Sequence, residues 1–496
     1  MPLTPDAGLI SGYDPSRRLD LVLVNTPIRD YAQHARNHGF TLPVLGMGYL
    51  ATYAAVHGLA VGVLDAEAHA LPVARVVDLV NGLRPRWVGL NLLSPTYELS
   101  ARIAAGLSPD IRLMAGGHHA KAMPAEILQD QRMRHLTALV LGEAETRVTE
   151  LLADHQRRRR LPGVLWREPA TGRLLAGDPS GAPHHLAPDV NRLPYLDRRF
   201  LAFDPYRAAD GRLEANLVGA RGCPYDCSFC GAAVSSNPDV TVRIRHINSI
   251  LGELHHLYRN HQVTAFRFVD DLLLGSRRGM TTLMEGFRSE RVGDWAVWDA
   301  TGRINVLYRC RDRLLDLLVA GGLRELALGI ESGSPRVLAR LDKRVHPDMT
   351  RTVVRRLCER GINVKGYVML GLPTETVADL DATTRLVREL WYLTDRLPGR
   401  FRVSAFEFRP YPGTREWDRL VASGRFDPRR LCRYAAVDLP DCGEDEPLRS
   451  RDEFGFSVGV QFGDVPVNEI RRRLASLLRE QHHRQDAAFD ARTSSS

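Results

Sequence analysis

Short apolar runs alternate with helical stretches along the first third of the chain. Strands that are apolar along their whole length and alternate with helices are typical of a parallel sheet covered on both faces. The pattern predicts a doubly wound, Rossmann-like α/β domain over 19–155, after a tail at 1–18. The runs expected to form strands lie at 19–24, 59–64, 87–93, 111–114 and 136–141, with a first helix at 45–57.

A second series of the same kind begins after a polar, proline-containing segment at 156–212, which we interpret as a linker with a short hairpin around 163–166. Six parallel strands suit a partial (β/α)6 barrel over 213–420, with its chemistry at the C-terminal ends of the strands. The weakly patterned remainder, 421–496, is predicted to be a small C-terminal appendage with one helix near 467–481. The runs expected to form the barrel strands lie at 215–219, 265–269, 296–300, 325–330, 363–370 and 402–408.

The composition limits the classes of protein. The chain has 496 residues, of which 44% are hydrophobic and 25% charged, and this excludes a mainly disordered protein. No apolar run nears the ~18 residues of a membrane span, and the N-terminus lacks a signal-peptide pattern, so we expect a cytoplasmic protein that does not bind membranes. The net charge is +8. The basic runs at 157–160 and 471–473 lack interleaved aromatic residues, which favours a solvated face over nucleic-acid binding.

Three cysteines stand close together directly after the apolar run at 217–220. Cys223, Cys227 and Cys230 have the spacing C-x3-C-x2-C. Soft thiolates select zinc or iron–sulfur, and a closed zinc site normally takes four ligands. Cys310, the nearest other cysteine, is placed in a predicted helix well downstream. A [4Fe–4S] cluster held by the three cysteines would therefore keep one iron open, with a zinc knuckle as the alternative. The other four cysteines, Cys310, Cys358, Cys432 and Cys442, are interpreted as plain thiols.

This loop, with Phe229 before its third cysteine, resembles the defining loop of the radical S-adenosylmethionine (SAM) enzymes. The resemblance implies that Cys223, Cys227 and Cys230 bind a [4Fe–4S] cluster whose open iron chelates SAM. One electron, from a donor of the flavodoxin or ferredoxin type, then cleaves SAM to methionine and a 5′-deoxyadenosyl radical. That radical takes hydrogen from an unactivated carbon of the substrate.

Three strings in the first domain resemble the cobalamin-binding-like domain of many radical SAM enzymes. They are the segments 25–27, 43–50 and 116–119. The Asp-x-His-x-x-Gly string of one cobalamin-binding branch is absent, and His118 replaces the proline of Gly-Gly-Pro-His. We therefore expect the fold, favour a domain without cobalamin over one that binds it, and interpret His118 and His119 as loop-packing residues.

Polar residues follow most of the predicted barrel strands, in strings that resemble those of the same family. The resemblance implies that Asp270 contacts the SAM amino group, that Glu331 binds the ribose diol, and that Phe229 and Ser332 also contact cofactor. We add Arg303, at the end of the third strand, to these candidates. The strings 371–375, with Thr374 where the family has glycine, and 410–414 complete the series. For Ser332 and Thr374 a strand cap or helix N-cap remains the alternative.

Two further acids are candidate catalytic residues. Asp299 lies on the third strand, and Glu407 alternates with Arg409 on the sixth, so a period of two places that pair on one face. A buried acid needs a partner, which a cationic or polyhydroxy substrate would supply. The alternative is an internal ion pair with arginine.

Taken whole, the chain resembles the radical SAM diol-dehydratases of aminoglycoside antibiotic biosynthesis, of the apramycin-pathway type. This implies hydrogen abstraction from a sugar carbon of a paromamine-like aminoglycoside and loss of the neighbouring hydroxyl as water. A separate reductase would then act on the keto product. A cobalamin-dependent radical SAM C-methyltransferase acting on a natural product is the alternative, and a tRNA-modifying or other nucleic-acid-binding protein is a third hypothesis.

Overall fold

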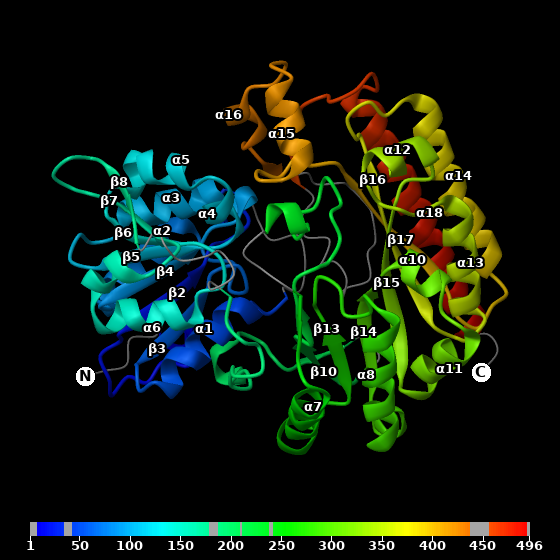
Figure 1. Cartoon of the computed structure of the whole chain (residues 1–496), viewed down its shortest axis with the longest axis horizontal. Coiled ribbons are helices and arrows are strands. Elements are labelled where there is room, and N and C mark those ends of the chain that lie inside the picture. The colour runs from blue at the N-terminus through cyan, green and yellow to red at the C-terminus, as the bar shows by residue number, and fades with distance from the viewer. Residues whose placement is uncertain are drawn as a thin grey trace. The chain divides into compact units, whose positions relative to one another are not determined.

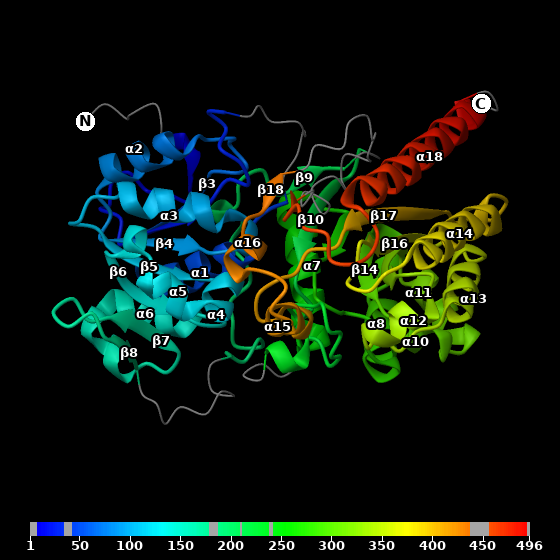
Figure 2. The ribbon, with the colours of Figure 1, turned by 90° about the horizontal axis from the view of Figure 1, so that it is seen from above.

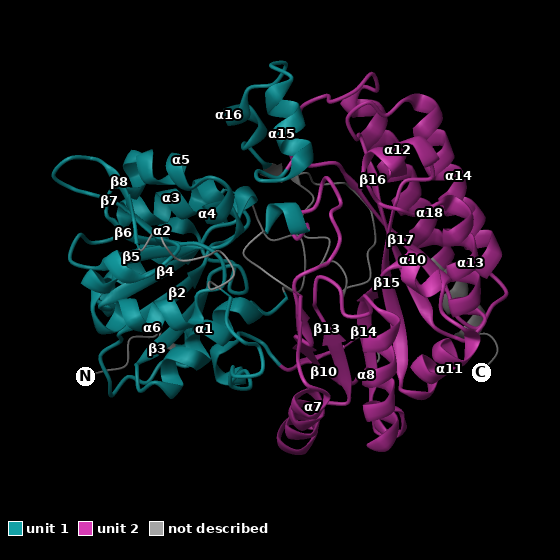
Figure 3. Ribbon diagram, viewed as in Figure 1, with its two compact units in different colours: residues 1–204, 234–241, 411–434 teal, residues 205–233, 242–410, 435–496 magenta. Residues whose placement is uncertain are grey.

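The chain forms two compact units (Figure 3). The computed structural model describes residues 7–33, 42–177, 187–208, 211–237, 242–436 and 456–493. The first unit comprises residues 1–204, 234–241 and 411–434, and the second comprises 205–233, 242–410 and 435–496. The domain boundaries predicted at 155, 212 and 420 stay predictions.

The first unit is built on a sheet with the strand order β1-β3-β2-β4-β5-β6-β7-β8 (Figure 1). The five central strands, β3 to β6 in that order, run parallel, and the remaining strands are antiparallel to their neighbours. This confirms the predicted doubly wound α/β fold. The strands are β1 (Ile10–Ser11), β2 (Leu21–Asn25), β3 (Val61–Asp65), β4 (Trp87–Asn91), β5 (Arg112–Gly116), β6 (Leu136–Val140), β7 (Val164–Arg167) and β8 (Leu174–Ala176).

Alternation along the strands lets helices cover both faces of this sheet. Val22 and Val24 of β2 pack in one hydrophobic cluster with α2, α3 and α5, while Leu21 and Leu23 pack in another with α1 and α6. Apolar side chains on both faces of a strand are what a sheet buried between two layers of helices requires. The helices are α1 (Leu45–Val56), α2 (Val73–Leu83), α3 (Tyr97–Gly106), α4 (His118–Ala122), α5 (Pro124–Gln129) and α6 (Glu145–Ala153).

Two segments that the sequence pattern placed outside the sheet add strands to it. β1 comes from the predicted tail and pairs with β3, where Gly62 leaves the space that Ile10 fills. The hairpin expected around 163–166 is confirmed as β7 and β8, and β7 extends the sheet beside β6. Such short edge strands show little alternation of apolar and polar residues. The sequence pattern therefore did not predict that they join the sheet.

The second unit contains the six parallel strands of the predicted partial barrel. Their order is β17-β16-β15-β14-β13-β10, with the short antiparallel strand β9 beyond β10. Each barrel strand therefore lies next to the one that precedes or follows it in the sequence. The strands are β9 (Tyr206–Arg207), β10 (Leu213–Leu217), β13 (Ala265–Phe268), β14 (Val297–Gly302), β15 (Leu323–Glu331), β16 (Asn363–Leu370) and β17 (Phe401–Glu407), with two small ladders of β11 (Ala220–Arg221) with β12 (Arg243–Ile244) and β18 (Ala435–Ala436) with β19 (Phe456–Ser457).

The C-terminal helix lies along β17, the edge strand of this sheet (Figure 2). The helix predicted near 467–481 is confirmed and extends to Thr493. The described helices that follow the cysteine loop in the chain are α7 (Ile247–His261), α8 (Arg277–Ser289), α9 (Val292–Trp295), α10 (Ile304–Tyr308), α11 (Asp312–Ala320), α12 (Pro335–Arg340), α13 (Pro347–Cys358), α14 (Val377–Thr394) and α18 (Val467–Thr493) in the second unit, and α15 (Arg415–Ala422) and α16 (Pro428–Leu431) in the first. Within the described ranges, no helix combines the length and apolar character needed to cross a membrane.

Candidate active site

Alternation along the barrel strands separates an apolar outer face from a polar inner face. On β15, Leu326, Leu328 and Ile330 belong to the core shared with the helices, and Glu325 and Glu331 point to the other face. An inner face lined by charged and polar groups is suited to binding a ligand rather than to packing a core. The candidate residues of the second unit can be placed relative to this face.

An ion-pair network occupies the N-terminal half of the inner face, and it contains Asp299. The Asp299 carboxylate accepts hydrogen bonds from Arg267 at 3.2 Å and from Arg324 at 2.9 and 2.6 Å. Arg324 also contacts Glu214 at 2.8 Å. Burial raises the pKa of Glu214, but the Arg267 and Arg324 guanidiniums outweigh burial and hold that pKa below its usual value. Asp299 therefore has protein cations as partners, as in the ion-pair alternative, and its substrate role stays a prediction.

Asp270 shapes the start of the cysteine loop. Its Oδ1 accepts hydrogen bonds from the backbone N–H of Gly219 at 2.8 Å and Ala220 at 2.5 Å. Its Oδ2 is buried and has no hydrogen-bond partner in the described part of the chain. Burial raises the pKa of Asp270 to about 7. One oxygen is thus available for the predicted contact with the SAM amino group, which stays a prediction.

The cysteine loop lies beside Arg303. Cys227 is buried, and Cys223 and Cys230 are partly exposed. The Arg303 guanidinium donates a hydrogen bond to Cys227 Sγ at 3.4 Å and lies 3.6 Å from the centre of the Tyr225 ring. A cation next to a sulfur ligand stabilises the thiolate form that binds metal. The observed contact of Arg303 is thus with Cys227 of the loop, and its predicted role as a cofactor contact stays a prediction.

Burial favours the protonated form of these thiols. Positively charged iron ions of a cluster would favour the thiolate form that binds metal. Burial raises the pKa of Cys230 to about 12 and also raises the pKa of Cys223, so both thiols are protonated in the absence of metal. Among the described residues, no three His, Cys, Asp or Glu side chains are arranged to hold a single metal ion. Each cysteine of a [4Fe–4S] cluster binds a different iron, so its three ligands need not converge on one point. Cys310 lies between α10 and α11 rather than inside a helix, and Cys442 lies outside the described residues.

Glu331 pairs with Lys343 next to the cysteine loop. The Lys343 Nζ is 2.6 Å from Glu331 Oε1 and 5.8 Å from the centre of the Phe229 ring. Both charged side chains are buried. Gly329 has no Cβ, and one there would collide with this ion pair. Phe229, Glu331 and the loop cysteines therefore lie in one neighbourhood at the C-terminal end of the barrel, as the resemblance implied.

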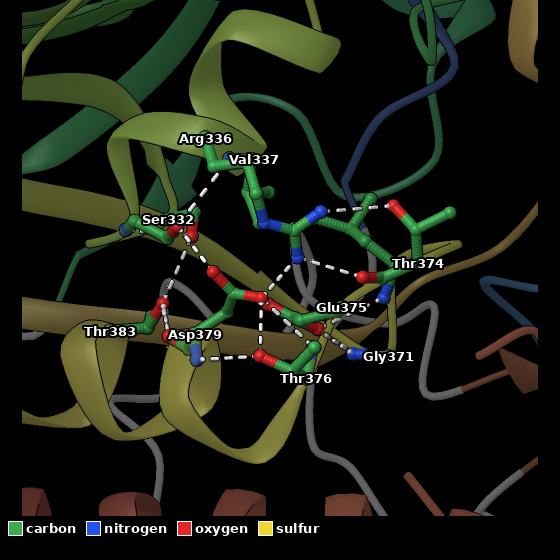
Figure 4. Close-up of polar contacts among 11 residues, drawn as sticks. Ser332, Arg336, Val337, Gly371, Thr374, Glu375, Thr376, Asp379 and Thr383 are labelled. Atoms are coloured by element: carbon green, nitrogen blue, oxygen red, sulfur yellow. Dashed lines mark hydrogen bonds and ion pairs between the residues drawn. The ribbon is translucent and has the colours of Figure 1, made fainter. Parts of the chain in front are cut away.

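Ser332 and the turn after β16 form a hydrogen-bonded cap at the start of α14 (Figure 4). The Ser332 hydroxyl is fully buried, 3.0 Å from Thr383 Oγ1, and accepts the Ser334 N–H at 3.1 Å. Asp379 accepts hydrogen bonds from Ser334, Thr376 and Arg336. These contacts correspond to the capping alternative for Ser332, whose role as a cofactor contact stays a prediction.

Glu407 and Arg409 have different surroundings, and only Glu407 lies within β17, so the shared face expected for the pair stays a prediction. Glu407 accepts hydrogen bonds from Ser457 and, at 3.2 Å, from Arg471 of α18, on the helix-covered side of β17. Arg409 lies beyond the end of the strand, with its guanidinium 5.2 Å from the Phe406 ring. The period of two ends with the strand at Glu407. Glu407 therefore has an arginine partner, again as in the ion-pair alternative.

In the first unit, the strings that resemble a cobalamin-binding-like domain meet at the C-terminal ends of the parallel strands. Asn25 donates a hydrogen bond to Asp65 at 2.8 Å, and the His119 ring is 2.9 Å from Ser94 Oγ. Burial lowers the pKa of His119 to about 4, so its ring is neutral. Gly117 has a φ of 106°, and a Cβ there would collide with the neighbouring strand end. His119 is thus packed in this edge, as expected, whereas His118 is exposed.

Sequence reasoning missed Lys343 and Tyr225, which lie against Glu331 and Arg303. A signal for Lys343 was present, because the chain has 67 lysines and arginines and only three are lysines, namely Lys121, Lys343 and Lys365. Lys343 and Lys365 are both buried in the second unit.

Comparison with known families assigns both units. Residues 35–152 match the B12 binding domain, and residues 217–387 match the radical SAM superfamily. The chain is a radical SAM enzyme with a B12-binding domain. The second match includes the cysteine loop and the strands β11 to β16. The enzyme therefore has the cluster-and-SAM domain that the spacing of Cys223, Cys227 and Cys230 predicted.

The relatives of the enzyme include named methyltransferases. It is 25% identical over 404 residues to an uncharacterized methyltransferase of Pyrococcus horikoshii, covering 81% of this chain and 83% of that protein. It is 23% identical over 499 residues to the cytidylyl-2-hydroxyethylphosphonate methyltransferase of Streptomyces wedmorensis, covering 88% and 89%. The radical SAM methyltransferase TsrM from Kitasatospora setae, solved with tryptophan and a SAM analogue, has the same fold, with a TM-score of 0.63 at 18% identity over 82% of this chain and 76% of that one.

These findings correct two expectations. The resemblance to diol-dehydratases and the dehydration of an aminoglycoside are overturned by the methyltransferase relatives. The preference for a domain without cobalamin is reversed by the match to the B12 binding domain. The physical reason is that the recognised strings hold the cluster and SAM, which dehydratases and methyltransferases share, whereas no string reports the substrate. The separate reductase for the keto product falls with the dehydration hypothesis.

Proposed function

We propose that this enzyme is a cobalamin-dependent radical SAM methyltransferase that methylates a carbon of a small natural product. The observation that carries the proposal is the presence of a B12-binding domain and a radical SAM domain in one chain. When bound, the cluster would supply the electron that cleaves SAM, and cobalamin would carry the methyl group. An external donor of the flavodoxin or ferredoxin type would supply that electron to the chain.

The residues of the second unit have distinct roles in this proposal. Cys223, Cys227 and Cys230 hold the cluster, and Arg303 orients Cys227 by donating a hydrogen bond of 3.4 Å to its Sγ. Lys343 fixes the orientation of Glu331, whose carboxylate binds the ribose of SAM. Buried charges that are already paired need little reorganisation when a ligand binds, so this part of the site is rigid before SAM arrives.

The C-terminal strand ends of the first unit would hold cobalamin. Their glycine turn at 116–117 brings backbone close to the edge of the sheet, where ligands of doubly wound folds bind. His119 is hydrogen-bonded to Ser94 and neutral, so it serves the packing of this edge. No described histidine lies in an Asp-x-His-x-x-Gly string, so we assign no protein ligand to cobalt.

The test uses the full chain, reconstituted anaerobically with iron, sulfide and hydroxocobalamin, together with SAM and a reductant. We expect bound cobalamin absorbance, formation of 5′-deoxyadenosine, and formation of S-adenosylhomocysteine only when cobalamin is present, since SAM must lose its methyl group. Cys227→Ala should lose the cluster and 5′-deoxyadenosine but keep cobalamin. The matched control is Cys432→Ala, which replaces a partly exposed cysteine of the first unit. This variant should keep the cluster, the formation of 5′-deoxyadenosine and cobalamin. Absence of cobalamin binding and of S-adenosylhomocysteine would contradict the proposal.

A further inference from the structure

Arg409 is a buried cation with no counter-ion among the described residues. It is 9% exposed, and its Nη1 has no hydrogen-bond partner among the described residues. It also forms no ion pair with any residue of the described ranges. Glu407, two positions earlier, is already held by Ser457 and Arg471.

Two cations elsewhere on the inner face of the barrel, Arg267 and Arg402, are paired with acids. Arg267 contacts Glu214 at 3.0 Å, and Arg402 contacts Glu325 at 2.8 and 2.7 Å. An unpaired charge in a protein interior costs several kcal/mol of folding free energy in general. An unpaired buried charge is expected at a binding site. There the ligand supplies the opposite charge, and binding compensates for the lost stability of the free protein.

The surroundings of Arg409 suit a ligand that is both anionic and partly apolar. The guanidinium lies over the Phe406 ring at 5.2 Å, and that ring is 6.4 Å from the Tyr367 ring on β16. Both aromatic residues are only partly buried. They lie at the C-terminal end of the barrel, where this architecture carries its chemistry. A guanidinium donates two parallel hydrogen bonds to a carboxylate or phosphate, and the rings offer a flat apolar surface beside it.

We propose that Arg409 binds a carboxylate, phosphate or phosphonate group on the molecule that is methylated. This assignment rests on the proposed function and specifies that the substrate of the methyltransferase is anionic. SAM also carries a carboxylate, but its expected contacts come from elsewhere: Asp270 follows β13 and Arg303 follows β14. The edge strand β17 is separated from β14 by β15 and β16. The position of Arg409 therefore favours the substrate as the source of the anion.

Thermal unfolding of the full chain with small anions tests this assignment. Inorganic phosphate or acetate, compared with chloride at equal ionic strength, should raise the Tm of the wild type by a few degrees, because a ligand that binds only the folded state stabilises it. Arg409→Gln should lose that rise, and Arg409→Lys should keep part of it. Without anions, Arg409→Gln should be at least as stable as the wild type. Arg402→Gln is the matched control and should be less stable, since it leaves Glu325 buried without its partner.

The other outcomes overturn the proposal. Equal shifts in the wild type and Arg409→Gln, or no shift in the wild type, would remove the anion site. Destabilisation of Arg409→Gln to the level of Arg402→Gln would make Arg409 structural. If the Tm rise caused by SAM falls in Arg409→Gln together with the rise caused by phosphate, the anion is the carboxylate of SAM and the substrate assignment is wrong. Cobalamin absorbance of the same samples reports on the proposed function separately.

Discussion

Glu331 and Thr374 have left-handed backbone conformations, although neither is a glycine. Their φ angles are 65° and 68°. Glu331 is the last residue of β15, and Thr374 lies in the turn after β16. Such conformations are rare for residues with a Cβ, and they cluster at binding sites where the surrounding structure enforces them. At Glu331 the conformation turns the carboxylate toward Lys343. At Thr374 it directs the backbone carbonyl to Arg336, 2.7 Å away.

Replacing Thr374 by glycine should stabilise the enzyme. A β-branched residue at a φ of 68° is strained, and glycine adopts this conformation freely. The gain is expected to be about 0.5–1 kcal/mol, since glycine also gives the unfolded chain more conformational freedom. The free energy of unfolding in urea measures this. Thr352→Gly, within helix α13, is the control and should destabilise, and a loss of stability in both variants would show that Thr374 is not strained.

Glu375 should make stability depend on pH. Burial raises the pKa of this carboxyl from 4.5 to about 7, while its Oε2 accepts the N–H groups of Gly371 and Leu372. Between those pH values the folded protein keeps a proton that the unfolded chain has lost, so stability falls as the pH rises from 4.5 to 7.

Glu375→Gln removes this titration and keeps the accepting oxygen. Its stability relative to the wild type should therefore rise by up to about 3 kcal/mol between pH 5 and pH 8, at about 1.4 kcal/mol for each pKa unit. Urea unfolding at both pH values gives the comparison. A difference that does not change with pH would contradict the raised pKa of Glu375.

Among the secondary-structure elements, helix α18 covers β17, the edge strand of the barrel sheet. β17 is an edge strand, and an unpaired N–H on such an edge must find another acceptor when it is buried. The side chain of Gln481 provides one: its Oε1 accepts the Val403 N–H at 2.9 Å and the Trp391 Nε1–H at 3.0 Å. One polar side chain thus connects α18 to both β17 and α14, so the helix is part of the barrel fold.

Gln481→Leu should destabilise the second unit. Two buried donors would lose their acceptor, at about 1–3 kcal/mol each, so we expect a loss of about 2–6 kcal/mol. His483→Leu, at an exposed position two residues further along α18, is the matched control and should change stability little. Urea unfolding followed by tryptophan fluorescence reports on both variants. Equal stability of Gln481→Leu and the wild type would show that α18 is not needed to cover β17.

At the scale of the whole molecule, the two compact units are not continuous in sequence. Residues 234–241 and 411–434 belong to the first unit, although the chain on either side of each belongs to the second. The chain therefore passes between the units more than once. A reading of hydrophobic periodicity along the chain assigns contiguous segments, so it does not detect such exchanges.

The sequence by itself determined the α/β class, the six barrel strands and the cysteine loop. Near-continuous apolar strands alternate with helices because each strand is buried on both faces or on its outer face, and this pattern is local. The spacing of Cys223, Cys227 and Cys230 is local too, because one loop must place its ligands around one cluster. Both features could be predicted without knowing which strands are neighbours.

Only the tertiary structure decided which polar residues on the strands are already paired. Asp299 and Glu407 looked alike in sequence as unpartnered acids, but their partners Arg324 and Arg471 lie 25 and 64 residues further along the chain. Arg409, which looked like the partner of Glu407, forms no ion pair with any described residue. Ion pairs between distant segments leave no periodic trace, because they depend on strand register and on where each strand ends.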